Sequence, residues 1–299
     1  MNTRRALLVD AFAAEPLSGN AAGVVPDASG LSKGQMQSIA RELAVSETAF
    51  VLSTETSDRR LRYFTPRQEV DLCGHATIAA HAHLREDGVV DDGIHTLETN
   101  VGELDIEIEL DGTVWMTQDR PRVERVEIDY ERLGSALGID PAALRDVGAD
   151  APVAVASTGL PFLIVPVNFL QNLGSADPDF GAVAALADEH DAAGIYAFTF
   201  DALGAESTLH ARAFAPGVGI DEDPVTGTAS GACGAYLREI GAFEEFPDEM
   251  RFEQGHFLDR PGEVRVRVAG EVRVGGRAVT ALDGDIVVPD VNADEIVEA

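Results

Sequence analysis

The stretch "GHATIAAHAHLRE" (residues 74–86) recurs later in the chain as "GTASGACGAYLRE" (residues 227–239). Both copies begin at a glycine and end at "LRE", with alanine, threonine or serine at matching positions between them. Small or apolar residues surround each predicted helix on all sides, which indicates burial all round rather than along one stripe. The repeat therefore predicts two buried helices, each at the centre of its own half of the chain.

Shorter matches precede both copies of this helix. "RYFTP" (62–66) recurs as "RAFAP" (212–216), and "ETAFVL" (47–52) resembles "IYAFTF" (195–200). Three matches in the same order favour an internal duplication. We therefore expect an α+β fold of two pseudo-symmetric halves, each with strands wrapped around a central helix. The predicted halves are residues 1–122, completed by the strand region 283–299, and residues 123–282, with a charged linker at 117–129.

Composition limits the partners of the chain. Its 299 residues include 52 acidic and 22 basic side chains, a formal net charge of −30. Such a field repels nucleic acid and anionic membrane surfaces, and no apolar run of about 18 residues exists, so neither is expected as a partner. The N-terminal "ALLVDAF" predicts a first strand rather than a secretion signal, so we expect a cytoplasmic protein.

The acidic residues are scattered along the chain, and Lys33 is its single lysine. An acidic, lysine-poor surface suits a cytoplasm with very high salt, where repulsion between like charges is screened. We therefore expect a halophilic protein that melts at a higher temperature in multimolar KCl than at low salt. Equal melting temperatures throughout a KCl series would contradict this expectation.

Cysteine and histidine spacing argues against disulfides and metal ions. Two cysteines in a chain of this length do not make a disulfide framework. His75, His81 and His83 lack the three- or four-residue spacing that brings two ligands to one helix face. We expect no metal site here, and expect His81 and His83 to be packed or surface residues.

The residues at the two helix starts have a structural and a functional interpretation. Cys73 is either a small residue in a tight turn or a thiol activated by the helix N-terminus. Its match in the second copy is Thr226, which cannot act as a base near neutral pH, so racemisation by two thiols is disfavoured. His75 either caps the helix or faces a cleft. Cys233, deep in the second helix, is predicted to be core.

Three further residues also have two interpretations. Glu47 is either a strand-edge glutamate or a proton shuttle, and its match in the second half is Ile195, so the repeat itself does not require a carboxylate. Asp223 belongs either to an ordinary helix cap or to a ligand loop. Asn20, in "PLSGNAAGVV" (16–25), lies in a plain turn or in a ligand loop.

Several of these stretches together resemble the PhzF family, the phenazine biosynthesis-like proteins related to diaminopimelate epimerase and proline racemase. The matching stretches span residues 9–237 in the order found in the family: "VDAFAAEPLSGNAAGVV", "ARELAVSETAFV", "RYFTPRQEVDLCGHATIAAHAHL", "STGLPFLIVPV" and "DEDPVTGTASGACGAYL". The resemblance implies the diaminopimelate epimerase-like fold: two alike halves, each a strand-rich barrel around a central helix, with the active site between them.

The resemblance also implies roles for individual residues. Glu47 of "SETAF" corresponds to the acid/base, His75 of "CGHAT" and Asp223 of "EDPVTG" to its catalytic partners. The implied substrate-binding residues are Asn20, Gly74, Gly227 and Thr228. The family usually has a serine or a similar small polar residue at the position of Thr228. Cys73 and Thr226 are possible further site residues.

The implied activity is that of a homodimeric, cofactor-independent isomerase, which moves a proton on a small carboxylate-bearing metabolite. Two alternatives stay open. One is a proline racemase-like racemase or dehydratase that uses Cys73 opposite Thr226. The other is a non-catalytic protein that binds small molecules.

Overall fold

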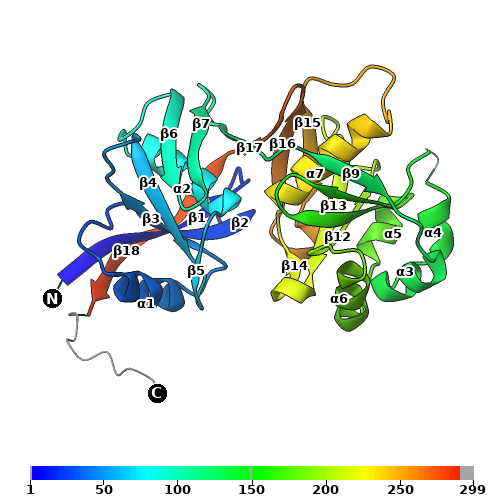
Figure 1. The fold of residues 1–299 in the computed structure, drawn as a ribbon, viewed down its shortest axis with the longest axis horizontal. Coiled ribbons are helices and arrows are strands. Elements are labelled where there is room, and N and C mark those ends of the chain that lie inside the picture. Colours follow the sequence, from blue (N-terminus) through cyan, green and yellow to red (C-terminus); the bar gives the residue numbers. More distant parts are fainter. Residues whose placement is uncertain (1, 148–149, 290–299) are drawn as a thin grey trace. The chain divides into compact units, whose positions relative to one another are not determined.

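The structure is a computed structural model that describes residues 2–147 and 150–289. The chain divides into two compact units, each described by itself below (Figure 1). The first unit comprises Met1–Ala11, Ala21–Val114 and Arg277–Ala299, and the second comprises Phe12–Asn20 and Trp115–Gly276. Residues 290–299 of the predicted C-terminal strand region lie outside the described residues.

Segment 12–20 belongs to the second unit, whereas the sequence analysis assigned it to the first half. Backbone hydrogen bonds account for the difference. The N–H of Glu263 donates to the carbonyl of Phe12 at 2.9 Å, and the N–H of Gly19 donates to the carbonyl of Pro261 at 3.0 Å. Donor and acceptor of both bonds are main-chain groups: every residue carries the carbonyl, and every residue except proline carries the N–H. The residue types of the sequence therefore could not predict these bonds.

The first unit contains eight strands in its described residues, and two helices, α1 (Lys33–Leu43) and α2 (Gly74–Glu86). The strands are β1 (Asn2–Ala11), β2 (Asn20–Val25), β3 (Thr48–Leu52), β4 (Arg59–Phe64), β5 (Glu69–Val70), β6 (Gly93–Thr99), β7 (Gly102–Ile108) and β18 (Ala278–Val288). The first residue of β2, Asn20, is the last residue of the segment 12–20.

Over the residues of the second unit that the structure describes, the chain forms the other strands and five α-helices. The strands are β8 (Val114–Thr117), β9 (Arg122–Arg125), β10 (Ala154–Ser157), β11 (Pro161–Pro166), β12 (Gly194–Thr199), β13 (Leu209–Ala215), β14 (Ile220–Asp223), β15 (Met250–Gln254), β16 (Gly262–Val268) and β17 (Val272–Gly276). The helices are α3 (Tyr130–Leu137), α4 (Pro141–Arg145), α5 (Leu170–Gly174), α6 (Phe180–Asp188) and α7 (Gly227–Glu239).

The order of strand pairing repeats between the units. In the first unit β2 and β3 are parallel, β3 and β4 antiparallel, β4 and β6 parallel, and β6 and β7 antiparallel. In the second unit β11 and β12 are parallel, β12 and β13 antiparallel, β13 and β15 parallel, and β15 and β16 antiparallel. The predicted duplication is therefore present in the sheets as well as in the helices.

Each unit has a buried helix among its strands. Helix α2 contacts β1, β3 and β18, and α7 contacts β9, β10, β11, β16 and β17 (Figure 1). Figure 1 shows α2 in cyan and α7 in yellow within their respective sets of strands. The expectation of two α+β halves, each built around a central helix, is confirmed.

Helix α1 sets the start of the strand that follows it. Ser32 and Gln35 form a capping box at its N-terminus, and Ala44 ends it in the left-handed conformation with a φ of 54°. Its buried face packs Met36 and Ile39 against core residues that include Phe50 of β3. This packing fixes where β3 begins, directly after Glu47.

Two segments that the sequence analysis expected to be irregular contain strands. Residues 20–25 form the mostly buried strand β2, although the glycine and asparagine residues predicted a turn. A Cβ at Gly23 would lie 2.5 Å from Oγ1 of Thr48, so this glycine permits close strand packing. The predicted linker 117–129 contains β9. Among the described helices, none has both the length and the apolar character needed to cross a membrane.

Candidate active site

A cluster of a carboxylate, a thiol and an imidazole lies in the first unit. Glu47 directly precedes β3, Cys73 is the N-cap residue of α2, and His75 is in the first turn of that helix. Nε2 of His75 lies 3.4 Å from Oε2 of Glu47, and Sγ of Cys73 lies 3.4 Å from Nδ1 of His75. One potential ligand atom from each residue lies within 4.8 Å of the others, so these three could hold a metal ion.

The imidazole of His75 has a further partner that sequence analysis missed. Oγ of Ser46 is hydrogen-bonded to Nε2 of His75 at 3.3 Å, so Ser46 and Glu47 both face this nitrogen. The side chains of His75 and Glu47 are 13% and 19% exposed, which leaves them accessible to a ligand while much of their surface is shielded from water. The only signal for Ser46 in the sequence was its position next to Glu47.

The start of α2 is open. No side-chain hydrogen bond caps it at Cys73, and a Cβ at Gly74 would meet no heavy atom within 4 Å. The first-turn N–H groups of a helix have no intrahelical acceptors and carry the positive end of its dipole. An anionic group can therefore approach the helix beside His75.

The rest of α2 is structural. Oγ1 of Thr77 donates to the carbonyl of Cys73 at 2.7 Å and accepts from the buried Tyr63 hydroxyl at 2.6 Å. His81 is 1% exposed and donates from Nδ1 to the carbonyl of Thr77 at 2.9 Å. Burial lowers the pKa of His81 to about 4, so its ring is neutral near pH 7. His81 and His83 are both buried in the packed part of the helix.

A second polar cluster surrounds Asp223 in the second unit. Nδ2 of Asn20 donates to Oδ1 of Asp223 and to the carbonyl of Val225, both at 2.9 Å. The hydroxyl of Thr226 donates to Oδ2 of Asp223 at 2.6 Å. The structure thus brings together Asn20, Asp223 and Thr226, which are widely separated in the sequence.

Gln254, at the end of β15, braces this second cluster. Its Oε1 accepts from the N–H of Thr226 at 3.0 Å, and its Nε2 donates to the carbonyl of Asp223 at 2.8 Å and to Oγ1 of Thr226 at 3.1 Å. Gln254 is only 1% exposed, so water does not compete for these hydrogen bonds. Gln254 is therefore a positioning residue for Asp223. No sequence pattern indicated it, because it lies in a separate strand that comes after α7, far along the chain from Asp223.

Gly227 and Thr228 occupy the first turn of α7. A Cβ at Gly227 would lie 2.9 Å from Cζ of Phe12, so packing of this aromatic ring requires glycine. Phe12 itself has a φ of 60°, a conformation that is uncommon for a bulky residue. The backbone carbonyl of Thr228 accepts from the Thr158 hydroxyl at 3.2 Å. In contrast to Gly74, Gly227 is covered on its Cβ side.

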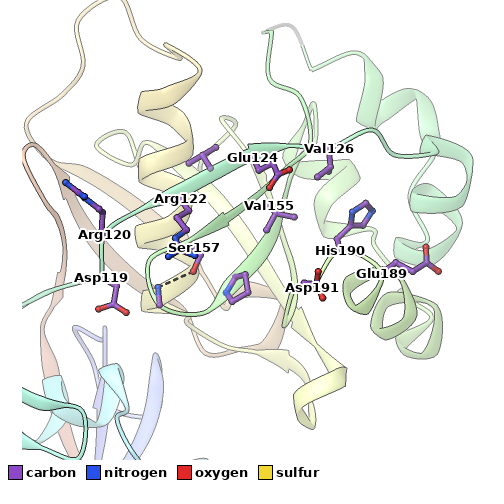
Figure 2. Close-up of a pocket in the computed structure, with 13 residues that line it drawn as sticks. Asp119, Arg120, Arg122, Glu124, Val126, Val155, Ser157, Glu189, His190 and Asp191 are labelled. Atoms are coloured by element: carbon purple, nitrogen blue, oxygen red, sulfur yellow. Dashed lines mark hydrogen bonds between the residues drawn. The ribbon is translucent and has the colours of Figure 1, made fainter.

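A surface pocket of about 910 Å³ lies elsewhere in the second unit (Figure 2). Arg122 and Glu124 of β9 and Val155 and Ser157 of β10 line it, together with 189–191, which follows α6. The pocket shares no residue with the Glu47 cluster or the Asp223 cluster. It is therefore separate from the residues that the sequence analysis selected.

Comparison with known proteins gives a consistent family. The model of the family described as phenazine biosynthesis-like protein matches residues 9–284. The uncharacterized isomerase YfhB of Bacillus subtilis is 36% identical over 282 residues, which cover 92% of this chain and 94% of that protein. The trans-2,3-dihydro-3-hydroxyanthranilate isomerase of Pseudomonas chlororaphis is 33% identical over 298 residues, with 94% and 98% coverage.

A solved structure agrees with these matches. The crystal structure of the Bacillus anthracis phenazine biosynthesis protein of the PhzF family superposes with a TM-score of 0.89 at 34% identity. The alignment covers 96% of this chain and 100% of that protein. The fold expected from the sequence resemblance is thereby confirmed.

Proposed function

The chain belongs to the PhzF family and is an isomerase, and from this premise we propose that it moves a proton on a small carboxylate-bearing metabolite without a cofactor. Glu47 removes the proton and returns it elsewhere on the same skeleton. His75 and Asp223 assist. An isomerisation leaves the oxidation state of the substrate unchanged, so no electron acceptor enters the balance.

The observation that carries this proposal is the contact of Glu47 with His75 at the open start of α2, where Nε2 and Oε2 are 3.4 Å apart. The Glu47 carboxylate is the base, and the protonated carboxyl formed by its action is the acid of the return step. His75 and the unpaired N–H groups of the first helical turn stabilise negative charge that develops on the substrate or on its carboxylate.

The difference between the two units supports one acid/base rather than two. The sequence repeat aligns Glu47 with Ile195, which is buried in an apolar core. The strand register aligns it with Gly194 instead, because Thr48 pairs with Phe64 and Ile195 pairs with the matching Phe214. Neither residue offers a carboxylate. The position that matches Cys73 is Thr226, whose hydroxyl donates to Asp223. Cys233 lies inside α7, fully buried, and burial raises its pKa well above the usual value for a thiol. A racemase of the two-thiol type has no second thiolate in this arrangement.

The contact of Cys73 with His75 favours a second candidate, in which Cys73 itself acts as the base. A thiol within 3.4 Å of an imidazole nitrogen is the pairing that activates cysteine nucleophiles and bases. Under this alternative, a ligand protects Cys73 from iodoacetamide and Cys73→Ser loses turnover. Under the Glu47 proposal, Cys73→Ser retains turnover.

The substrate named for the Pseudomonas chlororaphis relative, trans-2,3-dihydro-3-hydroxyanthranilate, is the first compound to test. It combines a carboxylate with a partly unsaturated ring on which a proton can move. A metabolite extract offered to the protein in D2O extends the search to other compounds. Deuterium in one of them identifies an enzyme, whereas its absence from every compound that binds supports the non-catalytic alternative.

Glu47→Gln tests the residue assignment. Because the amide cannot accept the proton, we expect turnover and solvent-deuterium incorporation to fall by about 10²- to 10⁴-fold. The affinity for substrate should change little, since the amide retains the shape and polarity of the carboxyl group. Turnover of Glu47→Gln at the wild-type rate would remove Glu47 from the role.

A further inference from the structure

Glu47, Cys73 and His75 together offer one oxygen, one sulfur and one nitrogen donor within 4.8 Å of one another. We propose that they form a binding site for a borderline-soft divalent ion of the Zn²⁺ type, and that an ion held there inhibits the enzyme. The binding site stands independently of the proposed function. Only the inhibition rests on it, because inhibition requires that Glu47 carry the proton.

The spacing of the donors suits a tetrahedral ion. Zinc binds oxygen, nitrogen and sulfur ligands at about 2.0–2.3 Å, which places neighbouring donor atoms roughly 3.3–3.8 Å apart. Nε2 of His75 lies 3.4 Å from Oε2 of Glu47 and 3.9 Å from Sγ of Cys73. Small side-chain rotations bring the sulfur and the carboxylate into position around one ion.

The backbone around the cluster is fixed by packing, and one coordination position stays open. Cys73 and His75 lie at the start of the buried helix α2, and Glu47 precedes the buried strand β3. The ion replaces Ser46 as the partner of Nε2 of His75. A Cβ at Gly74 would meet no heavy atom within 4 Å, so water or an anion can reach this side. Three protein ligands with one open position are typical of accessible zinc sites.

The donor set also predicts selectivity. Thiolate and imidazole ligands favour Zn²⁺ and Co²⁺, whereas Mg²⁺ and Ca²⁺ require several oxygen ligands. The net charge of −30 raises the local concentration of cations. The positive end of the α2 dipole opposes the bound cation, but it also favours the ionised thiolate and carboxylate. Binding of the ion displaces the thiol proton.

Cobalt is the probe for the site, because Co²⁺ bound to a thiolate absorbs in the near ultraviolet. The full chain is titrated with Co²⁺ in concentrated KCl and excess Mg²⁺, which occupy weak sites on the acidic surface. We expect a thiolate-to-cobalt charge-transfer band that saturates at one equivalent and disappears when Zn²⁺ displaces the cobalt.

Variants identify the ligands. We expect Cys73→Ser to lose the band, and Glu47→Gln to keep it but bind cobalt more weakly, because a neutral amide oxygen is a poorer ligand than a carboxylate. Cys233→Ala is the matched control and should keep the band, because Cys233 is fully buried in α7. The absence of a band in the wild-type chain, or its persistence in Cys73→Ser, would overturn the proposed site.

Turnover tests the consequence separately. An ion on Glu47 ties up the carboxylate lone pair that takes the proton, so Zn²⁺ should inhibit over the same concentration range in which it displaces cobalt. If cobalt binds as expected and Zn²⁺ leaves turnover unchanged, the proposal that the bound ion inhibits turnover is wrong, and Glu47 is not the base. If Zn²⁺ inhibits without displacing cobalt, the inhibitory ion binds elsewhere and the proposal fails.

Discussion

The first turns of α2 and α7 share one hydrogen bond to the backbone and differ in the side chains that surround them. In each helix a hydroxyl four residues after the N-cap bonds back to the N-cap carbonyl, from Thr77 at 2.7 Å and from Ser230 at 2.9 Å. Around α2 the side chain of the N-cap residue, Cys73, makes no capping hydrogen bond, and Sγ of Cys73 lies beside the pair of Glu47 and His75. Around α7 Gln254 binds the N-cap N–H and Phe12 covers the first glycine.

Other features are the same in both units and therefore belong to the shared framework. Arg62 forms a forked pair with Glu69, and at the matching position Arg212 forms a forked pair with Glu222. Each central helix is also bonded to a buried tyrosine, although the two come from non-equivalent neighbouring strands, Tyr63 from β4 and Tyr196 from β12. The comparison separates structural residues, which recur in both copies, from site residues, which do not. It teaches that one copy holds the reactive groups while the other holds a fixed polar cluster.

The largest expected effect comes from placing a carboxylate at Ile195, which the sequence repeat aligns with Glu47. Ile195→Glu places an unpaired carboxylate in the apolar core of the second unit, and we expect a loss of more than about 3 kcal/mol in the free energy of unfolding. Ile195→Val should cost only about 0.5–1.5 kcal/mol. Urea unfolding at constant KCl measures both. Equal stability of Ile195→Glu and Ile195→Val would show that this core position accepts a carboxylate, against the expected cost of burying an unpaired charge.

The next effect concerns pH and His81, whose match in α7 is Gly234. Since burial holds the pKa of His81 at about 4, below its unfolded value of about 6.5, the unfolded chain binds the proton first as pH falls. Stability from this residue is therefore complete above pH 6.5 and decreases toward pH 4, by about 2–3 kcal/mol at pH 4.5. His81→Gln should remove this part of the pH dependence in urea unfolding between pH 7 and pH 4.5. An unchanged pH dependence would contradict the buried, neutral state.

Loss of the brace at α7 ranks third. Gln254→Leu removes the hydrogen bonds of Gln254 with the Thr226 N–H and the Asp223 carbonyl, which should cost about 2 kcal/mol of stability. Because Asp223 is then less well held, we also expect kcat to fall. Thr99, at the matching position of the first unit, is the control, and Thr99→Val should lower stability without changing kcat. A kcat that is the same for Gln254→Leu and the wild type would reduce Gln254 to a structural role.

The smallest expected effects are those on the shared framework. Tyr63→Phe removes the hydroxyl that bonds Thr77 at 2.6 Å, and Tyr196→Phe removes the one that bonds Ser230 at 3.0 Å. Each should cost about 1 kcal/mol, as is typical of a single hydrogen bond. Since the two bonds share no partner, the double variant should show the sum within about 0.5 kcal/mol. Thermal and urea unfolding measure these values, and a large difference between the two single variants would break the equivalence of the helices.

The repeat allowed much of this fold to be predicted. Helix α2 has the bounds 74–86 that the repeat indicated, and the strand that contains "ETAFVL" begins one residue after Glu47. Strand β2 was not predicted, because glycine has a low strand propensity. In the structure Gly23 is needed in this strand, since only glycine allows the close contact with Thr48. Segment 12–20 groups with the second unit, and the main-chain hydrogen bonds that connect it to 261–263 leave no mark on the sequence.

The site was less predictable than the fold. Motif resemblance selected Glu47 and His75, and the structure brings them together. Histidine spacing was judged only within one helix, so the combination of Cys73 and His75 with a carboxylate from another segment went unnoticed. Ser46 and Gln254 were missed for the same reason. Contacts between distant segments depend on strand register and helix placement, and local periodicity carries neither.

The pairing of β1 with β18 has a consequence for protein synthesis. These strands form an antiparallel ladder that joins Asn2–Ala11 to Ala278–Val288. Residues 21–114 leave the ribosome early, yet the sheet around α2 stays incomplete until the last strand has been made. The second unit needs only residues up to 276, and its N-terminal segment 12–20 is already present. The unit that carries Glu47 is therefore the first to be translated and the last to be finished, and a chain that stops before Arg277 exposes an unpaired edge of β1.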